Sequence, residues 1–230
     1  MTNGFVSLVG AGPGHPDYLT VKGARVLAQA EVIVYDALIS EEFRTLFPVG
    51  AEIRFVGKRC GKHSTSQEEI CALLVNGAQQ GKRVVRLKGG DPGLFSRGGE
   101  EILALRAAGI PFEIVPGVSS VFAGAAAAFF SPTHRGLSNR LVVFDGVVLM
   151  GSRQIERLAA GLIGAGASPE VPIVLVENAT LVDEHVAVAT LARAAAGELV
   201  PRTDGPGIIY VGAAVALAQA SAHAAVEAAA

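Results

Sequence analysis

Two hydrophobic patterns alternate over the first 115 residues, and this alternation constrains the fold more than any other feature. Runs typical of strands are separated by helix-type stretches near 21–29, 66–80 and 100–109. Strands joined through helices pair side by side in parallel. The sequence therefore predicts a mostly parallel sheet, with strands at FVSLV (5–9), VIVY (32–35), EIRFV (52–56), RVVRLK (83–88) and FEIV (112–115).

The expected helices carry recognisable end signals. Thr20 can accept a hydrogen bond from a free backbone N–H in the first turn of the helix that follows it. Ser66 and Glu69 form a capping box, and Gly81 is expected to end that helix. Gly109, followed by Pro111, should close the third helix.

The segment VPGVSS at 115–120 predicts a hinge, after which the chain becomes rich in alanine and glycine. Its 230 residues can form two domains, and we expect these at 1–116 and 117–230. The second is expected to contain a mixed sheet, with helices near 152–164 and 213–228. Its expected strands are LVVF (141–144), VVLM (147–150), PIVLV (172–176), VAVAT (186–190) and GIIYVG (207–212). Asp145-Gly146 would join the first two as a tight hairpin.

Composition excludes several classes of protein. Half of the residues are apolar and 17% are charged, as expected for a packed α/β protein, and a net charge of −2 does not favour nucleic acid. No apolar run reaches the ~20 residues of a membrane span, and no signal peptide opens the chain, so the cytoplasm is the expected location. The scattered histidines and two cysteines form no metal-site pattern. The basic stretch at 54–62 could hold a small anion.

The loop GAGPGHPDYLT (10–20) resembles a dinucleotide-binding turn, with Asp36 in the place of the ribose-binding acid. However, Gly14 comes one residue too early for the third glycine, and Pro13 lacks a donor N–H. The helix also begins too late to meet a pyrophosphate. Taken alone, the loop leaves a dinucleotide site and a plain connector equally open.

A second glycine-rich stretch, RLKGGDPGLFSRGGEE (86–101), follows the expected fourth strand. Glycines between Gly89 and Gly99 would let the backbone approach a ligand at the carboxyl end of that strand. Asp91, Arg97, Glu100 and Glu101 lie at close spacing among them. The alternative is a flexible turn leading into a solvated helix start.

Together, VGAGPGHPDYLT, VVRLKGGDPGLFSRGGEE, PGVSS and SPTHRGLS resemble, in order, the motifs of the tetrapyrrole methylase family. The patterns GRGGEE and THRGL resemble its uroporphyrinogen-III C-methyltransferases in particular. This chain departs from the family at Ser96, where glycine is usual, and it lacks the TGH segment and the long connector that normally follow THRGL. The resemblance thus implies a trimmed loop or absent residues at Asp145-Gly146 rather than a tight turn.

The resemblance implies a two-domain α/β fold with its active site in the interdomain cleft. S-adenosylmethionine would be the cosubstrate and no metal would be needed. The activity would be conversion of uroporphyrinogen III to precorrin-2 by way of precorrin-1, for cobalamin or sirohaem synthesis, by a homodimer. The implied cosubstrate contacts are Pro13, Gly89, Gly90, Asp91, Leu94, Ser119, Ser120, Met150, Ala179 and Gly207.

The same resemblance points to Arg97, Glu100, Asp36 and Arg135 as the catalytic set. A substrate with eight carboxylates needs cationic forks, which Arg97 and Arg135 supply. A carboxylate at Glu100 or Asp36 could stabilise the cationic ring. Arg97 is assigned to orientation because an arginine side chain stays protonated in proteins and cannot readily act as a base, and His134 to loop positioning, with acid–base work as the alternative.

Three rival functions stay open at this point. A methylase of a later corrin precursor would share the GGDP loop. A non-catalytic tetrapyrrole-binding module could keep the fold, and an oxidoreductase could use a dinucleotide at the first loop.

Overall fold

The computed structural model describes residues 4–57, 65–138, 140–143, 154–203 and 205–218. The chain divides into two compact units, Met1–Ser119 and Ser120–Ala230. Each unit is considered by itself below.

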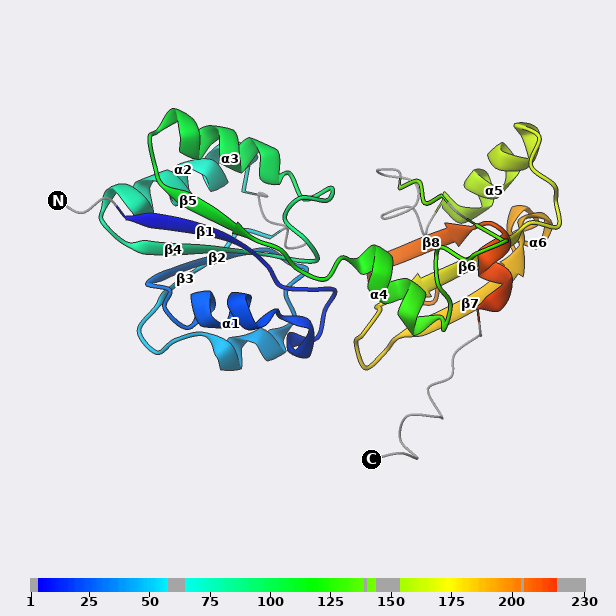
Figure 1. The fold of residues 1–230 in the computed structure, drawn as a ribbon, viewed down its shortest axis with the longest axis horizontal. Helices are drawn as coiled ribbons and strands as arrows, with labels where there is room; N and C mark the ends of the chain where they lie inside the picture. Colours follow the sequence, from blue (N-terminus) through cyan, green and yellow to red (C-terminus); the bar gives the residue numbers. More distant parts are fainter. Residues whose placement is uncertain (1–3, 58–64, 139, 144–153, 204, 219–230) are drawn as a thin grey trace. The chain divides into compact units, whose positions relative to one another are not determined.

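A five-stranded parallel sheet forms the centre of the first unit, in the order β3-β2-β4-β1-β5 (Figure 1). All four neighbouring pairs run parallel, which confirms the sheet expected from the sequence. The central position of β4 and β1 explains why both are almost wholly buried, since helices cover both faces of such a sheet. The strands are β1 (Phe5–Gly10), β2 (Val32–Tyr35), β3 (Glu52–Phe55), β4 (Arg83–Lys88) and β5 (Phe112–Val115).

Helices cover both faces of this sheet. α2 (Gln67–Gln79) and α3 (Gly98–Ala107) lie on one face, and α1 (Val21–Leu27) lies on the other (Figure 1). Two apolar clusters fill the two interfaces, one around Leu74 and Leu105 and the other around Leu27 and Phe43. Two short 3₁₀ helices, η1 (Pro16–Tyr18) and η2 (Glu41–Leu46), were not expected from the sequence.

The helix caps form as the sequence predicts. Thr20 Oγ1 accepts a hydrogen bond from the Gly23 N–H at 3.0 Å. At the start of α2, Ser66 Oγ accepts from the Glu69 N–H at 3.2 Å while the Glu69 carboxylate accepts from the Ser66 N–H at 2.7 Å. Each bond satisfies a donor that the helix itself leaves free, so local sequence sets where these helices begin.

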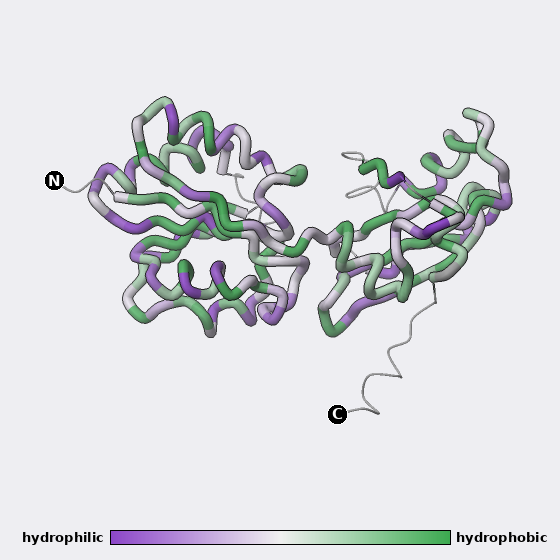
Figure 2. The backbone as a smooth tube through the Cα atoms, viewed as in Figure 1, coloured by the Kyte–Doolittle hydropathy of each residue, from purple (hydrophilic) through white to green (hydrophobic). Residues whose placement is uncertain are grey.

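The second unit is built on a three-stranded sheet in the order β7-β6-β8. Its strands are β6 (Pro172–Glu177), β7 (His185–Thr190) and β8 (Gly207–Val211). Hydropathy colouring shows these strands as largely apolar (Figure 2), and they separate two apolar clusters. The helices of the described part are α4 (Ser120–Ala127), α5 (Ile155–Gly164) and α6 (Leu191–Ala195), with the 3₁₀ helix η4 at Ala213–Leu217.

Several expectations for the second unit need correction. Residues 141–143 form no strand, and no described strand pairs with them. Leu141 and Val142 are exposed, so this segment is not packed into a sheet. The three described strands pair in antiparallel fashion, and the mixed sheet suggested by the sequence includes a further strand that these pairings do not cover. Asp145-Gly146 and the strand expected at 147–150 lie outside the described residues.

The expected helix at 213–228 is also different where the structure describes it. It is a single 3₁₀ stretch that ends before Ala218, whose backbone is extended. Alanine favours a helix by only fractions of a kcal/mol per residue, so packing decides. Here Ala214 and Val215 pack into an apolar cluster. α4 was missed because its alanine-rich sequence was considered only as a possible membrane span.

Candidate functional site

Three loops meet at the carboxyl end of the parallel sheet, where α/β proteins usually bind ligands. They follow β1, β4 and β5. Gly12 and Gly90 exchange backbone hydrogen bonds, at 3.2 Å from the Gly12 N–H and 2.7 Å from the Gly90 N–H. The Ala11 N–H also donates to the Lys88 carbonyl at 2.8 Å. The first loop and the GGDP loop are therefore joined through their main chains.

Glycine is required here because backbone packs directly on backbone. A Cβ added at Gly10 would lie 2.6 Å from the Gly117 Cα, and one at Gly117 would lie 2.3 Å from the Gly90 carbonyl oxygen. Gly12 and Gly90 also have positive φ angles, of 87° and 68°. The sequence suggested that these glycines bring backbone close to a ligand, whereas Gly10, Gly90 and Gly117 bring three loops close to one another.

Asp91 orders the GGDP loop. Its Oδ1 accepts a hydrogen bond from the Gly93 N–H at 2.7 Å, and its Oδ2 accepts from the Gly117 N–H at 3.0 Å. Gly89 packs against the loop that follows β2, since a Cβ added at Gly89 would lie 2.7 Å from the Leu38 Cβ. The carboxylate thus ties the loop after β4 to the loop after β5.

Arg86, Lys88, Glu101 and Asp36 form a buried charge cluster beneath these loops. Arg86 bonds Asp36 Oδ2 at 3.0 Å and Glu101 Oε1 at 3.1 Å, and Lys88 Nζ lies 2.9 Å from both Glu101 oxygens. The side chains of Arg86, Lys88 and Glu101 are 4%, 2% and 0% exposed, against 25% for Asp36. The cluster therefore presents one of its carboxylates, Asp36, to the outside.

Burial lowers the pKa of Lys88, and the neighbouring Arg86 cation lowers it further. The ion pair with Glu101 acts in the opposite direction but is the smaller influence. Two cations and two carboxylates balance formally, which makes burial of the whole group tolerable.

Arg97 and Glu100 form a different kind of pair, on the surface. Arg97 Nε lies 2.8 Å from one Glu100 oxygen and its terminal nitrogen lies 3.1 Å from the other, with both side chains at least half exposed. Arg97 sits at the N-cap of α3 with φ 58°, and Phe95 has φ 49°. Two non-glycine residues in the left-handed region indicate a loop held under strain.

Ser96 lies between these two residues and contributes a hydroxyl that glycine would lack. Its Oγ donates to the Pro92 carbonyl and accepts from the Gly98 N–H at 3.3 Å. The departure from the family pattern at this position therefore adds hydrogen bonds inside the loop.

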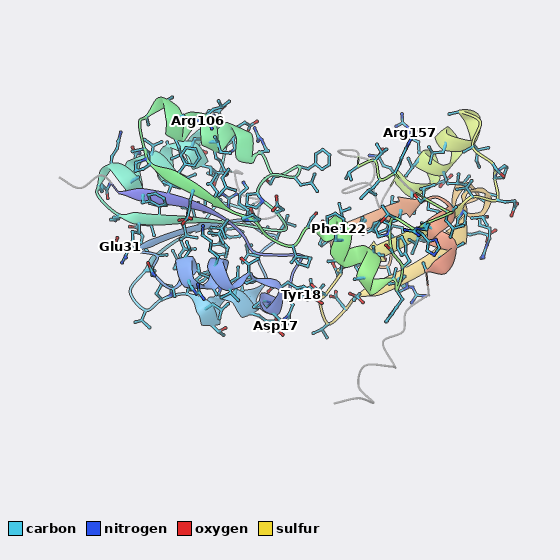
Figure 3. The ribbon with its side chains drawn as sticks, viewed as in Figure 1. Asp17, Tyr18, Glu31, Arg106, Phe122 and Arg157 are labelled. Atoms are coloured by element: carbon cyan, nitrogen blue, oxygen red, sulfur yellow. The ribbon has the colours of Figure 1, made fainter. Side chains whose placement is uncertain are left out.

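The other expected cosubstrate residues of the first unit lie close to these loops in sequence. Pro13 and Leu94 are half-buried, and Ser119 is buried as the last residue of the unit. Asp17 and Tyr18, on η1, have exposed side chains (Figure 3). The first loop thus combines a buried glycine backbone with an exposed outer turn.

In the second unit, Ser120 begins α4, and its carbonyl accepts from the Tyr210 hydroxyl at 3.3 Å. Arg135 is exposed in a turn closed by the His134 N–H and the Ser138 carbonyl at 2.7 Å, and no ion pair found among the described residues includes it. The closure uses the His134 main chain, so the role of its side chain stays a prediction. Phe122, on the outer side of α4, is also exposed (Figure 3).

Ala179 and Gly207 lie at one end of the antiparallel sheet. Gly207 pairs with Glu177, and the Asn178 N–H donates to the Pro206 carbonyl at 2.9 Å. The structure therefore places Ala179, in the loop after β6, near Gly207 at the start of β8. Met150 lies outside the described residues.

Sequence reasoning assigned no role in the site to four buried charged residues: Arg86, Lys88, Glu101 and Glu177. The signal was available for the first two, because both interrupt an apolar strand that a parallel sheet buries on two faces. Of the two adjacent acids at 100 and 101, the sequence selected the exposed one.

The basic stretch at 54–62 is described only in part. Arg54 pairs with Glu52 through a hydrogen bond of 2.7 Å from its Nε, and the lysines and arginine beyond it lie outside the described residues. Within the described ranges, no group of three or more His, Cys, Asp or Glu could hold a metal ion. Likewise, none of the helices described is long and apolar enough to cross a membrane.

Comparison with known proteins shows the family to which the chain belongs. The model of the Tetrapyrrole (Corrin/Porphyrin) Methylases matches residues 6–195. The chain therefore belongs to the tetrapyrrole methylase family, as its motifs suggested.

Among curated relatives, Siroheme synthase 2 of Cronobacter sakazakii is 42% identical over 93% of this chain and 51% of its own length. A siroheme synthase of Psychrobacter arcticus is 42% identical over 83% of this chain and 39% of its own length. The chain thus spans about half the length, or less, of the curated relatives it matches.

Solved structures show the same fold. Uroporphyrin-III C-methyl transferase from Thermus thermophilus, complexed with S-adenyl homocysteine, gives a TM-score of 0.79 at 37% identity, covering 93% of this chain and all of that one. Cobalt precorrin-4 methyltransferase gives 0.77 at 29% identity, covering 92% and 95%.

Proposed function

We propose that the protein is an S-adenosylmethionine-dependent C-methyltransferase that converts uroporphyrinogen III to precorrin-2, by way of precorrin-1. The observation that carries this proposal is the meeting of the Gly12, Gly90 and Gly117 loops at the carboxyl end of the parallel sheet. The names of its relatives, which act on uroporphyrin III or make sirohaem, support the substrate.

The cosubstrate is proposed to contact loops from both units. The first unit, 1–116 by sequence, would provide Pro13 and the GGDP loop, and the second, 117–230, would complete the site. Support comes from the Thermus thermophilus relative, whose structure contains S-adenyl homocysteine. The proposed contacts are Pro13, Gly89, Gly90, Asp91, Leu94, Ser119, Ser120, Met150, Ala179 and Gly207.

Because Asp91 already accepts two loop N–H groups, we infer that it acts partly by shaping the loop. Each carboxylate oxygen has a second lone pair, so a cosubstrate donor can still bind there. Loss of this carboxylate should therefore weaken cosubstrate binding both directly and through the loop.

The tetrapyrrole carboxylates are proposed to bind Arg97 and Arg135. Arg97 presents its planar guanidinium on the surface with one edge on Glu100, which fixes the direction of the fork. Arg135 is exposed in a hydrogen-bonded turn. Glu100 thus serves catalysis by orienting Arg97.

In the reaction, a pyrrole carbon forms a bond to the methyl carbon as the bond from methyl to sulfur breaks. Sulfur leaves neutral, and the ring carries a positive charge until a proton is lost. Asp36, held as a partner of the buried Arg86 cation, is the carboxylate proposed to stabilise that charge. Most of the acceleration comes from holding carbon and methyl in line.

A second candidate is methylation of a later corrin precursor. The likeness to cobalt precorrin-4 methyltransferase favours it, although at 29% identity against 37% for the uroporphyrin-III enzyme. The cytoplasmic location and the homodimer both stay predictions. Sedimentation of the purified protein can test the oligomeric state.

The decisive experiment is anaerobic incubation with uroporphyrinogen III and S-adenosylmethionine, followed by mass spectrometry. One and then two added methyl groups are expected. Turnover of a methylated corrin precursor alone would establish the second candidate. Titration with S-adenosylhomocysteine and with NAD separates a methyltransferase from an oxidoreductase. The Asp91→Ala variant should bind S-adenosylhomocysteine more weakly than the wild type.

A further inference from the structure

A buried carboxylate lies beneath two loops of the second unit that the proposed function assigns to the cosubstrate. Glu177 is the last residue of β6 and its side chain has no exposed surface. It pairs across the sheet with His185 on one side and Gly207 on the other. The loop at 178–184 leaves from this residue, and the loop before β8 ends beside it.

The Glu177 carboxylate binds the main chain of the loop that precedes β8. Oε1 accepts from the Thr203 N–H at 3.0 Å and from its hydroxyl at 3.2 Å, while Oε2 accepts from the Arg202 N–H at 3.0 Å. His185 Nδ1 lies 3.3 Å from Oε2. Charged acceptors make stronger hydrogen bonds than neutral ones, so this group fixes where the loop begins its approach to Gly207.

The other loop is held in an unfavourable conformation. Asn178 and Thr180 have φ angles of 49° and 72°, and Ala179 lies buried between them. A β-branched threonine in the left-handed region is a clear outlier. Such strain persists only where surrounding contacts impose it, and it is concentrated at functional sites.

Contacts from both sides hold this strained segment. The Thr180 N–H donates to the Glu184 carboxylate at 2.6 Å, and the Asn178 side chain donates to Asp183 at 2.6 Å. The Asn178 N–H also bonds the Pro206 carbonyl at 2.9 Å, so the two loops are tied to each other as well as to Glu177.

We propose that Glu177 is a positioning residue for the cosubstrate. It fixes the backbone around Ala179 and Gly207 in the geometry that S-adenosylmethionine needs, without touching the cosubstrate itself. Binding is stronger when such a loop is already ordered, because less conformational entropy is lost on binding. The inference rests on the proposed function.

The test is calorimetric titration of S-adenosylhomocysteine into the wild type and Glu177→Gln, at a temperature where both are folded. The Arg202 N–H bonds both carboxylate oxygens, at 3.2 and 3.0 Å, and the amide replaces one of these acceptors with a donor. We expect affinity to fall about ten-fold. A merely structural role would lower the unfolding temperature and leave affinity unchanged.

Leu191→Ala is the matched control. Leu191 is fully buried in α6, beyond the end of β7 opposite to the loop, so its truncation should lower the unfolding temperature without changing affinity. If Glu177→Gln fails to fold, Thr203→Val serves instead. It keeps the Glu177 carboxylate and removes the two hydrogen bonds of the Thr203 hydroxyl, to Glu177 and from the Gly205 N–H, and about three-fold weaker binding is expected.

Affinity within two-fold of the wild type, in whichever of these two variants folds, overturns the positioning role and leaves the proposed function standing. A wild type that does not bind S-adenosylhomocysteine gives a different result. It removes the proposed function and this inference with it.

Discussion

Each unit of the protein buries a carboxylate next to its proposed ligand loops, and the two are held in different ways. Glu101 in the first unit and Glu177 in the second are both fully buried. Glu101 binds the cationic side chains of Arg86 and Lys88, whereas Glu177 binds main-chain N–H groups and a hydroxyl, with His185 nearby. One carboxylate balances charge and the other orders backbone.

The difference reflects what each sheet offers. In the parallel sheet, β4 is central, so Arg86 and Lys88 cannot reach water and need buried anions. At the end of the antiparallel sheet, the chain leaves its ladder and its N–H groups need acceptors. Loss of Glu101 would therefore leave buried cations without their anion, while loss of Glu177 would leave main-chain N–H groups and a hydroxyl without an acceptor.

The largest expected effect follows from this contrast. Glu101→Gln should lower the free energy of unfolding of the first unit by about 3–5 kcal/mol. Lys88 would lose its anion, and Arg86 would keep only Asp36 of its two carboxylate partners. Glu177→Gln should cost the second unit about 1–3 kcal/mol. Hydrogen exchange of the β4 and β6 amides, followed in urea, measures each unit separately.

Glu100→Gln is the control for the first variant, since this neighbouring acid is half exposed and should cost less than about 1 kcal/mol. Equal losses for the two buried carboxylates would show that charge pairing is not what distinguishes the units.

The second prediction compares Arg97 and Arg135, the two exposed arginines proposed to bind the substrate. Arg97→Lys should retain S-adenosylhomocysteine binding but lower kcat/KM about 30-fold, or ~2 kcal/mol, because lysine keeps the charge and loses the fork fixed by Glu100. Arg135→Lys should lower it only about three-fold, as its guanidinium shows no such fixed partner in the described structure. Steady-state kinetics on purified uroporphyrinogen III measures both.

The pH dependence of turnover separates orientation from proton transfer at Arg97. Lysine has a pKa near 10.4 against above 12 for arginine, so a true base would work better as lysine at alkaline pH. Recovery of Arg97→Lys to wild-type rates there, with the wild type flat, would contradict the orientation role.

The sequence predicted the first unit closely because its signals are local and periodic. The alternation of strands and helices and the caps at Thr20 and Ser66 depend on neighbouring residues only. The second unit was harder, because alanine-rich segments such as 120–127 and 213–217 have weak periodicity and take their structure from packing. Fold class therefore followed from sequence more fully than element boundaries did.

For the site, residues in named motifs were found and the buried charges beneath them were not. Asp91 and Arg97 lie in glycine-rich loops that draw attention. The cationic partners of Glu101 lie 13 or more residues away in the sequence, and the main-chain donors to Glu177 lie 25 and 26 residues away, so only the tertiary fold reveals these contacts. The roles of the motif residues themselves stay predictions.

The third prediction concerns Lys88, whose pKa burial lowers below 10.5. Between its folded and unfolded pKa values the unfolded chain binds the extra proton, so stability rises with pH in that window. The free-energy cost of burying the charged Lys88 is fully present below its folded pKa and is gone once the pH passes 10.5. Relative to Lys88→Met, the wild type should gain stability as the pH rises toward 10.5, measured by urea unfolding.

An opposite or absent difference would show that Glu101 outweighs burial at Lys88. The second unit gives the internal control, because none of its described elements buries a lysine. Hydrogen exchange of β6 should therefore show no difference between the two proteins over the same pH range.

The smallest expected effect concerns a feature that the units share. Ser96 lies between Phe95 and Arg97, as Ala179 lies between Asn178 and Thr180, and all four flanking residues have positive φ. Ala179 is held by packing in an apolar cluster, whereas Ser96 is held by its hydroxyl.

Ser96→Ala should lower the free energy of unfolding by about 1 kcal/mol through lost hydrogen bonds, and Ser96→Gly by slightly more because glycine adds unfolded-state entropy. Turnover should stay within two-fold, since the hydroxyl faces its own loop. If urea unfolding showed Ser96→Gly to be more stable than the wild type, the loop of the first unit would be strained by its serine rather than held by it, and the parallel with Ala179 would fail.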